Sequence, residues 1–236
     1  MRALLAVLTF VAIVPALYSQ VTLAGWNFAS DYTTGLTGDL TADATTLDAN
    51  VTGGVLGAQN LTLAYQGIGS DIFGWTNWNT TNSIDKNEFI SFSITPNPGT
   101  FISLTSLDMY WVRAPGGSGG PRRYQIEVGF TNTGSFVATA ISKQATIGNS
   151  ATDGLLSFDL SGETSVQNIS TEVEFRIYGW RSGGDYGGMG DQLGDDLILQ
   201  GQVVPEPSTY ALMVGLLALL GAVLKKRMYR SEEGRV

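Results

Sequence analysis

Four carboxylates lie in a glycine-rich stretch near the end of the chain, over residues 183–196. They are Asp185, Asp191, Asp195 and Asp196. Carboxylates on a loop that turns at glycines can surround a hard cation with oxygen ligands, and calcium is the metal that such a set favours. Their spacing does not match the ligand order of an EF-hand loop. Two interpretations stay open, a solvated acidic loop and a structural calcium site, and the sequence indicates no other cofactor.

Aromatic residues supply a second kind of binding chemistry. Trp75 and Trp78 lie in a segment that resembles a loop, Trp180 directly follows an expected strand, and Tyr186 lies in the glycine-rich stretch. Exposed rings on loops can stack on the apolar faces of sugars, so these four are the candidate ligand-binding residues. The alternative is that the tryptophans belong to the hydrophobic core, as we expect for Trp111.

The composition excludes several kinds of active site. The 236 residues include no cysteine and no histidine, which rules out thiol nucleophiles, thiolate zinc sites and a Ser-His triad. A formal net charge of −8 argues against nucleic acid as a partner. Glu172 and Glu174 could form a pair for glycoside hydrolysis, but Arg176 shares their strand face and would neutralise them. We therefore expect that the protein is not an enzyme.

The N-terminus has the pattern of a secretory signal peptide. Arg2 precedes an apolar run from Ala3 to about Leu17, and Pro15 would break its helix near the end. We assign residues 1–19 to the signal peptide. The alternative is an uncleaved anchor, although about 15 apolar residues are short for a bilayer span.

The C-terminal region combines a rigid segment, an apolar run and a basic cluster. Two prolines keep the segment 204–209 extended, because each fixes a backbone angle and restricts the residue before it. The 15 residues of 210–224 are apolar and would form a helix of about 22 Å. Flanking residues, snorkelling lysines and local thinning can extend that length to a bilayer.

We therefore predict a single-pass transmembrane helix over 210–227. The basic cluster that ends it is Lys225, Lys226 and Arg227. Positive charges favour the cytoplasmic side, which places 228–236 in the cytoplasm and the body of the protein across the membrane. The alternative for the apolar run is a buried core helix.

The order of these parts resembles the PEP-CTERM sorting signal, over residues 204–230. The motif is Pro205, Glu206 and Pro207, the apolar run supplies the helix, and the basic cluster follows it. The resemblance implies a bacterial envelope protein, an exosortase-type enzyme as partner, and delivery to the cell surface or the extracellular matrix beside exopolysaccharide. Residues 228–236 depart from the pattern, because they continue past the basic cluster.

Residues 20–203 have the pattern of an all-β domain. Between Val21 and Val203 there are seven basic and 18 acidic residues. Alternating apolar and polar residues predict strands at 88–94, 103–113, 124–130, 172–178 and 196–201, with less regular ones near 26–28, 36–40, 44–51 and 60–65. Strands with one apolar face predict a single antiparallel β-sandwich, large enough to bury a core without disulfides.

The region from Leu104 to Gly201 resembles jelly-roll domains of the galactose-binding-like, carbohydrate-binding-module type. The resemblance is carried by six segments: the strand Leu104–Arg113, a glycine-rich turn at Gly116–Gly120, 123–128, 156–162, 173–178 and the acidic final strand Asp195–Gly201. The resemblance implies a jelly-roll sandwich and a carbohydrate as ligand.

These features predict an exported, non-enzymatic protein held by its C-terminal helix and sorted to the cell surface or an exopolysaccharide matrix. Its body would be structural or would bind carbohydrate weakly. The first alternative is a dedicated carbohydrate-binding module with structural calcium. The second is a glycoside hydrolase that uses carboxylates alone.

Overall fold

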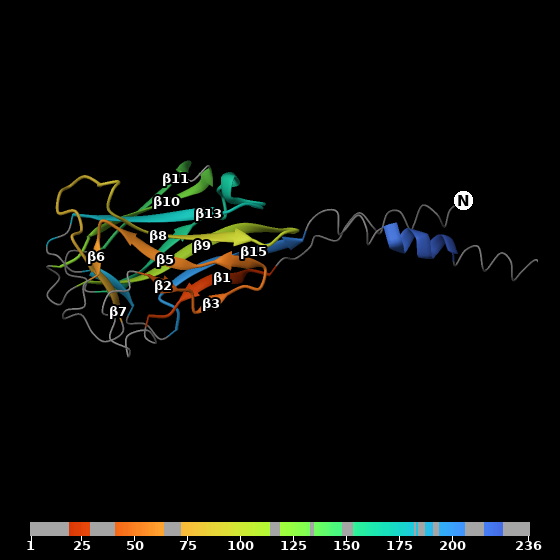
Figure 1. Ribbon diagram of the computed structural model, residues 1–236, viewed down its shortest axis with the longest axis horizontal. Coiled ribbons are helices and arrows are strands. Elements are labelled where there is room, and N and C mark those ends of the chain that lie inside the picture. The colour runs from red at the N-terminus through yellow and green to blue at the C-terminus, as the bar shows by residue number, and fades with distance from the viewer. Residues whose placement is uncertain are drawn as a thin grey trace, which may run out of the picture. The chain divides into compact units, whose positions relative to one another are not determined.

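The computed structural model describes residues 19–28, 41–63, 72–113, 119–132, 135–147, 153–181, 183, 187–190, 194–205 and 215–223. Within these ranges Ser19–Val204 belong to one compact unit. Figure 1 shows two layers of strands in this unit, with β8, β10, β11 and β13 in one and β1, β9 and β15 in the other. The predicted β-sandwich is therefore confirmed.

Sheet 1 contains eight strands, and each pairing for which a register is given is antiparallel. Its order is β3 (Thr46–Leu47), β1 (Val21–Trp26), β15 (Leu197–Pro205), β9 (Thr100–Arg113), β14 (Gly187–Gly190), β7 (Ile72–Thr76) and β6 (Thr62–Leu63), and β12 (Asp153–Asp159) also pairs with β9.

Sheet 2 contains seven strands and is likewise antiparallel in its described pairings. Its order is β11 (Ser135–Thr146), β10 (Arg123–Asn132), β13 (Val173–Trp180), β8 (Phe89–Pro96), β5 (Val55–Gln59) and β2 (Ala42–Asp43), and β4 (Val51–Gly53) also pairs with β8. A short 3-10 helix, η2 (Thr164–Val166), follows β12.

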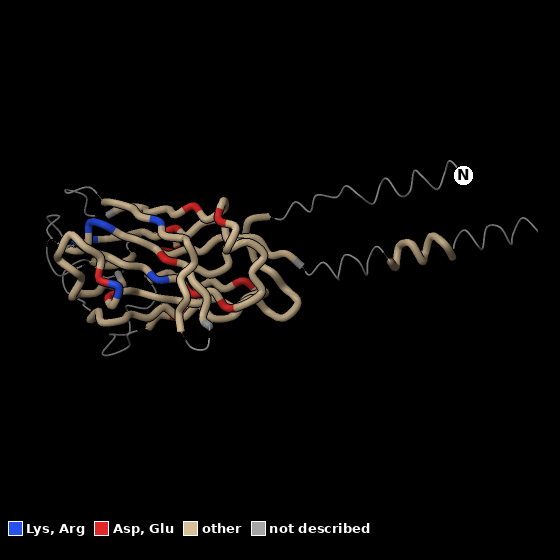
Figure 2. Tube along the Cα trace, turned by 90° about the horizontal axis from the view of Figure 1, so that it is seen from above, with Lys and Arg blue, Asp and Glu red and all other residues tan. Residues whose placement is uncertain are grey.

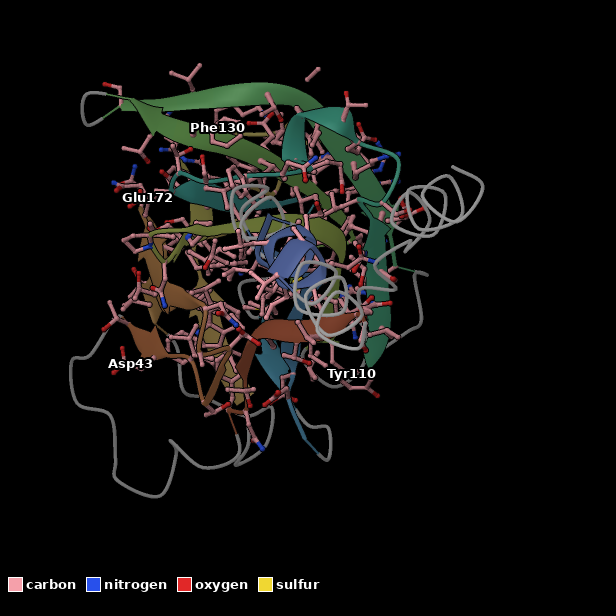
Figure 3. All side chains as sticks on the ribbon, turned by 90° about the vertical axis from the view of Figure 1, so that its right-hand side faces the viewer. Asp43, Tyr110, Phe130 and Glu172 are labelled. Carbon is pink, nitrogen blue, oxygen red and sulfur yellow. The ribbon has the colours of Figure 1, made fainter. Side chains whose placement is uncertain are left out.

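The strands of the core follow the alternation of the sequence. Three neighbouring strands of sheet 2 bury every second residue, namely Ile90, Phe92 and Ile94 of β8, Tyr124, Ile126 and Val128 of β10, and Val173, Phe175 and Ile177 of β13. In sheet 1, β9 does the same with Leu107, Met109 and Trp111. Apolar side chains on one face of each strand therefore fill the space between the layers. Seen end-on in Figure 3, Phe130 of β10 and Tyr110 of β9 mark the two sheets.

Two tryptophans of sheet 1 contact rings of sheet 2. The centroid of Trp26 lies 4.6 Å from that of Phe92, and Trp111 lies 4.4 Å from Tyr124. Trp26 is fully buried and donates its indole N–H to the carbonyl of Gly54 at 3.0 Å. A buried tryptophan is stable when its ring is closely packed and its indole N–H has a hydrogen-bond acceptor. Trp26 has both.

The glycine-rich stretch that the sequence indicated as a loop contains a buried strand, β14. It pairs with β7 on one side and β9 on the other. A side chain at Gly187 would not fit, because a Cβ there would lie 2.8 Å from Cζ2 of Trp111 and 2.9 Å from Cδ of Pro121. Gly187 therefore leaves room for the side chains around it, and the pairing of β14 with two strands corrects the loop interpretation.

The edge strand β11 was not expected from the sequence. Its pairing with β10 shifts, so that Ser142 opposes Glu127 whereas Ala138 opposes Gly129. The three residues between Ala138 and Ser142 form a bulge opposite Val128, and the Thr139 hydroxyl donates to the Val128 carbonyl at 2.7 Å. The bulge turns Ile141 into the core, where it is 2% exposed.

A helix over residues 215–223 belongs to a second unit, outside the sandwich. Its large apolar side chains are 50–67% exposed, and they are Leu216, Leu217, Leu219, Leu220 and Val223. Within the described ranges, no helix combines the length and the apolar character that crossing a membrane requires.

Several predicted segments lie outside the described residues. They are most of the signal peptide, the strand near 36–40, most of the turn at 116–120, Glu206 and Pro207 of the motif, the basic cluster 225–227 and the tail 228–236.

Candidate functional site

The outer face of sheet 2 carries a set of polar side chains that the register brings together. Because alternate residues of β13 face the core, Glu174, Arg176 and Tyr178 point away from it. Arg176 pairs across the strands with Glu127 and Ser91, and Glu174 pairs with Ser93. We call this set the outer face: Phe89, Ser91, Ser93, Gln125, Glu127, Glu174, Arg176 and Tyr178, with Lys86, Phe136 and Gln144 packed on it.

Arg176 is held between two rings and a carboxylate. Its guanidinium carbon lies 4.4 Å from the ring centroid of Phe89 and 3.9 Å from that of Phe136. Its Nε donates to Oε1 of Glu174 at 2.7 Å. The sequence interpretation that Arg176 would neutralise Glu174 is confirmed, whereas Glu172 lies just before β13. This geometry leaves Arg176 oriented rather than free to rotate.

Phe136 reaches the outer face because β10 has a glycine beneath it. A Cβ at Gly129 would lie 2.4 Å from Cε2 of Phe136 and 2.6 Å from the backbone oxygen of Val137. Gly129 therefore lets the ring of Phe136 cross β10 and cover Arg176.

Glu127 is the acceptor at the centre of a second polar group. It forms an ion pair with Lys86 and accepts a hydrogen bond from Nε2 of Gln125 at 3.0 Å. Gln125 in turn accepts from Nε2 of Gln144 at 2.8 Å. The amides and the carboxylate form one connected row across β11, β10 and the loop before β8.

Tyr178 stays protonated over the physiological pH range. Burial, and then the neighbouring Glu127 carboxylate, raises the pKa of Tyr178 to about 12. The ammonium of Lys86 lies 4.2 Å from its ring centroid and covers the ring. Tyr178 therefore supplies a hydroxyl donor rather than a phenolate.

A hollow lies next to these groups on the same face. Its volume is about 280 Å³, and it is lined by Val55, Gly57, Ser91, Phe92, Ser93 and Glu174. Gly57 helps to open it, because a Cβ at this position would meet only Cγ2 of Thr41, at 3.9 Å. The hollow is slightly smaller than the roughly 300–1,000 Å³ of typical small-molecule sites, so it suits a small or partly exposed ligand.

The candidate tryptophans are buried, so the expectation of an exposed stacking platform is wrong for them. Trp75 belongs to β7 rather than to a loop and is fully buried, while Trp78 and Trp180 are 2% and 4% exposed. Trp78 lies between Trp75 and Trp111, with centroid distances of 6.4 and 5.6 Å. The rings of Trp75, Trp78 and Trp111 therefore pack against one another at one end of the core. Tyr186 lies outside the described residues.

The two described acids of the glycine-rich stretch, Asp195 and Asp196, accept hydrogen bonds from a hydroxyl and a backbone N–H. Asp196 is 1% exposed, and its Oδ2 accepts from the backbone N–H of Phe28 at 2.8 Å. Asp195 accepts from the hydroxyl of Thr45 at 3.1 Å. Among the residues described, no group of three or more acids is placed to hold a metal. Asp185 and Asp191 lie outside them, so the calcium site stays a prediction.

Sequence reasoning missed most of the outer face. The alternation of β10 and β13 could have identified Gln125, Glu127 and Tyr178 as outward residues. It could not show that Glu127 and Arg176 are neighbours, because cross-strand register does not appear in the sequence. Lys86 comes from the loop before β8 and gave no signal.

Comparisons with known proteins give structural likeness at low identity. No protein-family model matches the chain, and no curated protein matches its sequence. The CBM22-1 xylan-binding domain from Paenibacillus barcinonensis Xyn10C is similar at 12% identity and a TM-score of 0.38, over 81% of this chain and 99% of that domain.

Two further structures have similar scores. The K3 cleaved adhesin domain of Lys-gingipain from Porphyromonas gingivalis has 10% identity and a TM-score of 0.36, over 77% of this chain and 99% of that one. The xylan-binding module CBM15 has 14% identity and a TM-score of 0.32, over 79% and 96%. At these scores the likenesses assign neither a ligand nor a binding residue to this chain.

Proposed function

We propose that this protein is a non-enzymatic component of a bacterial cell envelope, exported and then sorted by its C-terminal segment. Its sandwich binds carbohydrate weakly through the outer face of sheet 2. The sorting half of the proposal is supported by the sequence of a Pro-Glu-Pro motif, an apolar run and a basic cluster within residues 204–230. The binding half is supported by the hollow beside Glu174.

The exposed apolar helix fits a membrane-retained segment. Side chains such as Leu217, 67% exposed, are costly in water and favourable in a hydrocarbon environment. The extended stalk that the prolines impose would present Glu206 to a processing enzyme at the membrane surface. An exosortase-type enzyme is the partner that this arrangement fits.

Replacing Pro205, Glu206 and Pro207 by alanines is expected to leave the protein retained in the membrane and unprocessed, because the recognition charge and the rigid shape are both lost. Cell fractionation and mass spectrometry of the mature protein measure this. The matched control is a triple alanine replacement of Ser231, Glu232 and Glu233, beyond the basic cluster. Unchanged processing of the motif variant would contradict the sorting proposal.

The outer face has the groups that bind sugar hydroxyls. Ser91, Ser93 and Glu174 line the hollow with hydroxyl and carboxylate oxygens, and Val55 adds an exposed apolar contact. Glu127 and Glu174 are each tied to a cation, which suits a positioning role better than general acid or base catalysis. A shallow site with few contacts is expected to bind with a dissociation constant on the order of 1 mM, about −4 kcal/mol.

Gly57→Leu is expected to abolish binding of neutral oligosaccharides such as xylo-oligosaccharides while leaving the fold intact. The new side chain fills the hollow, and its Cβ meets only Thr41, at van der Waals distance. Titration followed by NMR suits such weak binding. Gly154→Leu on β12 is the matched control, because a Cβ there has open space within 4 Å. Equal binding by wild type and Gly57→Leu would exclude the hollow as the site.

A further inference from the structure

Arginines gather at one end of the sandwich, where β10 begins and β13 ends. The register pairs Arg123 with Trp180, and the backbone N–H of Arg122 donates to the carbonyl of Trp180 at 3.2 Å. Arg122 and Arg181 therefore lie at the adjoining ends of two paired strands. Figure 2 shows that the Lys and Arg residues of the sandwich lie in one half of its length, at the left of the view.

Arg113 lies behind this group, at the end of β9. It is 1% exposed, and its Nε donates to the carbonyl of Gly119 at 2.7 Å. Burial lowers the pKa of Arg113, and the charge of Arg122 lowers it further, while Tyr124 acts in the opposite direction. The positive charge of Arg122 therefore acts on Arg113. Four arginines lie at this end of the fold: Arg113, Arg122, Arg123 and Arg181.

The charge pattern of the domain makes this gathering unusual. Only seven basic residues face 18 acidic ones between Val21 and Val203. Three of the seven bases are each in a described ion pair, namely Lys86 with Glu127, Lys143 with Glu163, and Arg176 with Glu174. Within the described part of the chain, no carboxylate forms an ion pair with Arg123 or Arg181, and the buried Nε of Arg123 has no hydrogen-bond partner.

The backbone holds Arg181 in a costly conformation. Its φ is 59°, in the left-handed region that residues with a side chain rarely adopt. The backbone N–H of Arg181 donates to the carbonyl of Thr81 at 3.1 Å, and Asn79 bridges to Trp180 beside it. Strain of this kind persists only where the surrounding structure imposes it, and it is concentrated at functional sites.

We propose that Arg123 and Arg181 form a site for the carboxylate groups of an acidic polysaccharide, such as one containing uronic acids. The inference rests on the proposed carbohydrate binding and names the class of ligand. Guanidinium groups match carboxylates with two parallel hydrogen bonds, which a neutral sugar cannot supply. Two cations at one end of an acidic body are too few to follow a nucleic-acid backbone.

The site continues the outer face along β13. Trp180 lies six positions after Glu174, or about 20 Å at ~3.3 Å per residue. One polymer chain that lies along β13 could therefore contact the arginines and the hollow at the same time. Repeated weak contacts along one polymer raise the overall affinity.

The test is a titration of the full chain in detergent with polygalacturonate. We expect binding that weakens as salt increases and that falls at least tenfold when Arg123 and Arg181 are both changed to Gln. Arg181→Asn alone should also weaken binding, and it should fold well because Asn tolerates the left-handed region. The matched control is Lys143→Gln, whose ammonium is already paired with Glu163.

Three further probes make the result decisive. Methyl-esterified polygalacturonate should bind at least tenfold more weakly than polygalacturonate. Single-stranded RNA should bind no more tightly than the methyl ester does. The inference would be overturned by equal binding of the ester or by tighter binding of RNA. Unchanged binding by Arg181→Asn and by the Arg123/Arg181 double variant would also overturn it. Xylo-oligosaccharide binding reports on the hollow alone, so a chain that binds polygalacturonate but not the neutral sugar supports the arginine site and contradicts the hollow.

Discussion

Gly187→Val is expected to lower the free energy of unfolding by about 3 kcal/mol, at the upper end of typical overpacking costs. The strand β14 lies between β7 and β9, and a Cβ at Gly187 would lie 2.8 Å from Trp111, 2.9 Å from Pro121 and 3.1 Å from Cα of Gly120. One of these neighbours is backbone, so a side-chain rotation cannot remove all of the overlap. Urea unfolding followed by tryptophan fluorescence measures the change.

The control for this variant is Gly154→Val. Gly154 lies in β12, and a Cβ there has nothing within 4 Å. Because glycine weakens a strand, the replacement should be neutral or slightly stabilising. If both variants change stability equally, the glycine-rich stretch is a loop after all and the description of β14 is wrong.

Trp26→Ala is expected to cost about 3–5 kcal/mol, the usual range for removing a large buried ring. The loss combines the contact with Phe92, at a centroid distance of 4.6 Å, with the hydrogen bond to Gly54 at 3.0 Å. Trp26→Phe keeps most of the ring contact and loses the hydrogen bond, so it should cost clearly less. Equilibrium unfolding of both variants separates the two contributions.

Val137→Ala is the control for Trp26. Val137 lies in β11 and is 53% exposed, so the change should stay within about 0.5 kcal/mol. A cost for Trp26→Ala that is no greater than this would show that Trp26 does not connect the two sheets.

Much of the fold could be predicted from alternation, because the strands that alternate most clearly form the middle of the sandwich. β8, β10 and β13 bury the residues that the pattern indicated. β14 could not be predicted this way, since glycine at 187 is required by the neighbouring Trp111 and Pro121 rather than by an alternating pattern. β11 was missed because its exposed side and its bulge obscure the alternation.

The candidate site could be predicted only in part. The pairing of Arg176 with Glu174 follows from two positions on one strand, and the sequence indicated it. The contact of Lys86 with Glu127 joins residues 41 positions apart and depends on the register of three strands. The tryptophans were misassigned because loop-like composition around Trp75 and Trp78 conceals a buried strand and its continuation.

The bulge in β11 affects how neighbouring molecules meet. An uninterrupted twelve-residue edge strand would offer a straight row of amide and carbonyl groups with which the backbone of a second chain could pair. The extra residues after Ala138 break that row, and the Thr139 hydroxyl takes up a backbone carbonyl of β10. Neighbouring molecules would therefore remain separate instead of growing into fibrils.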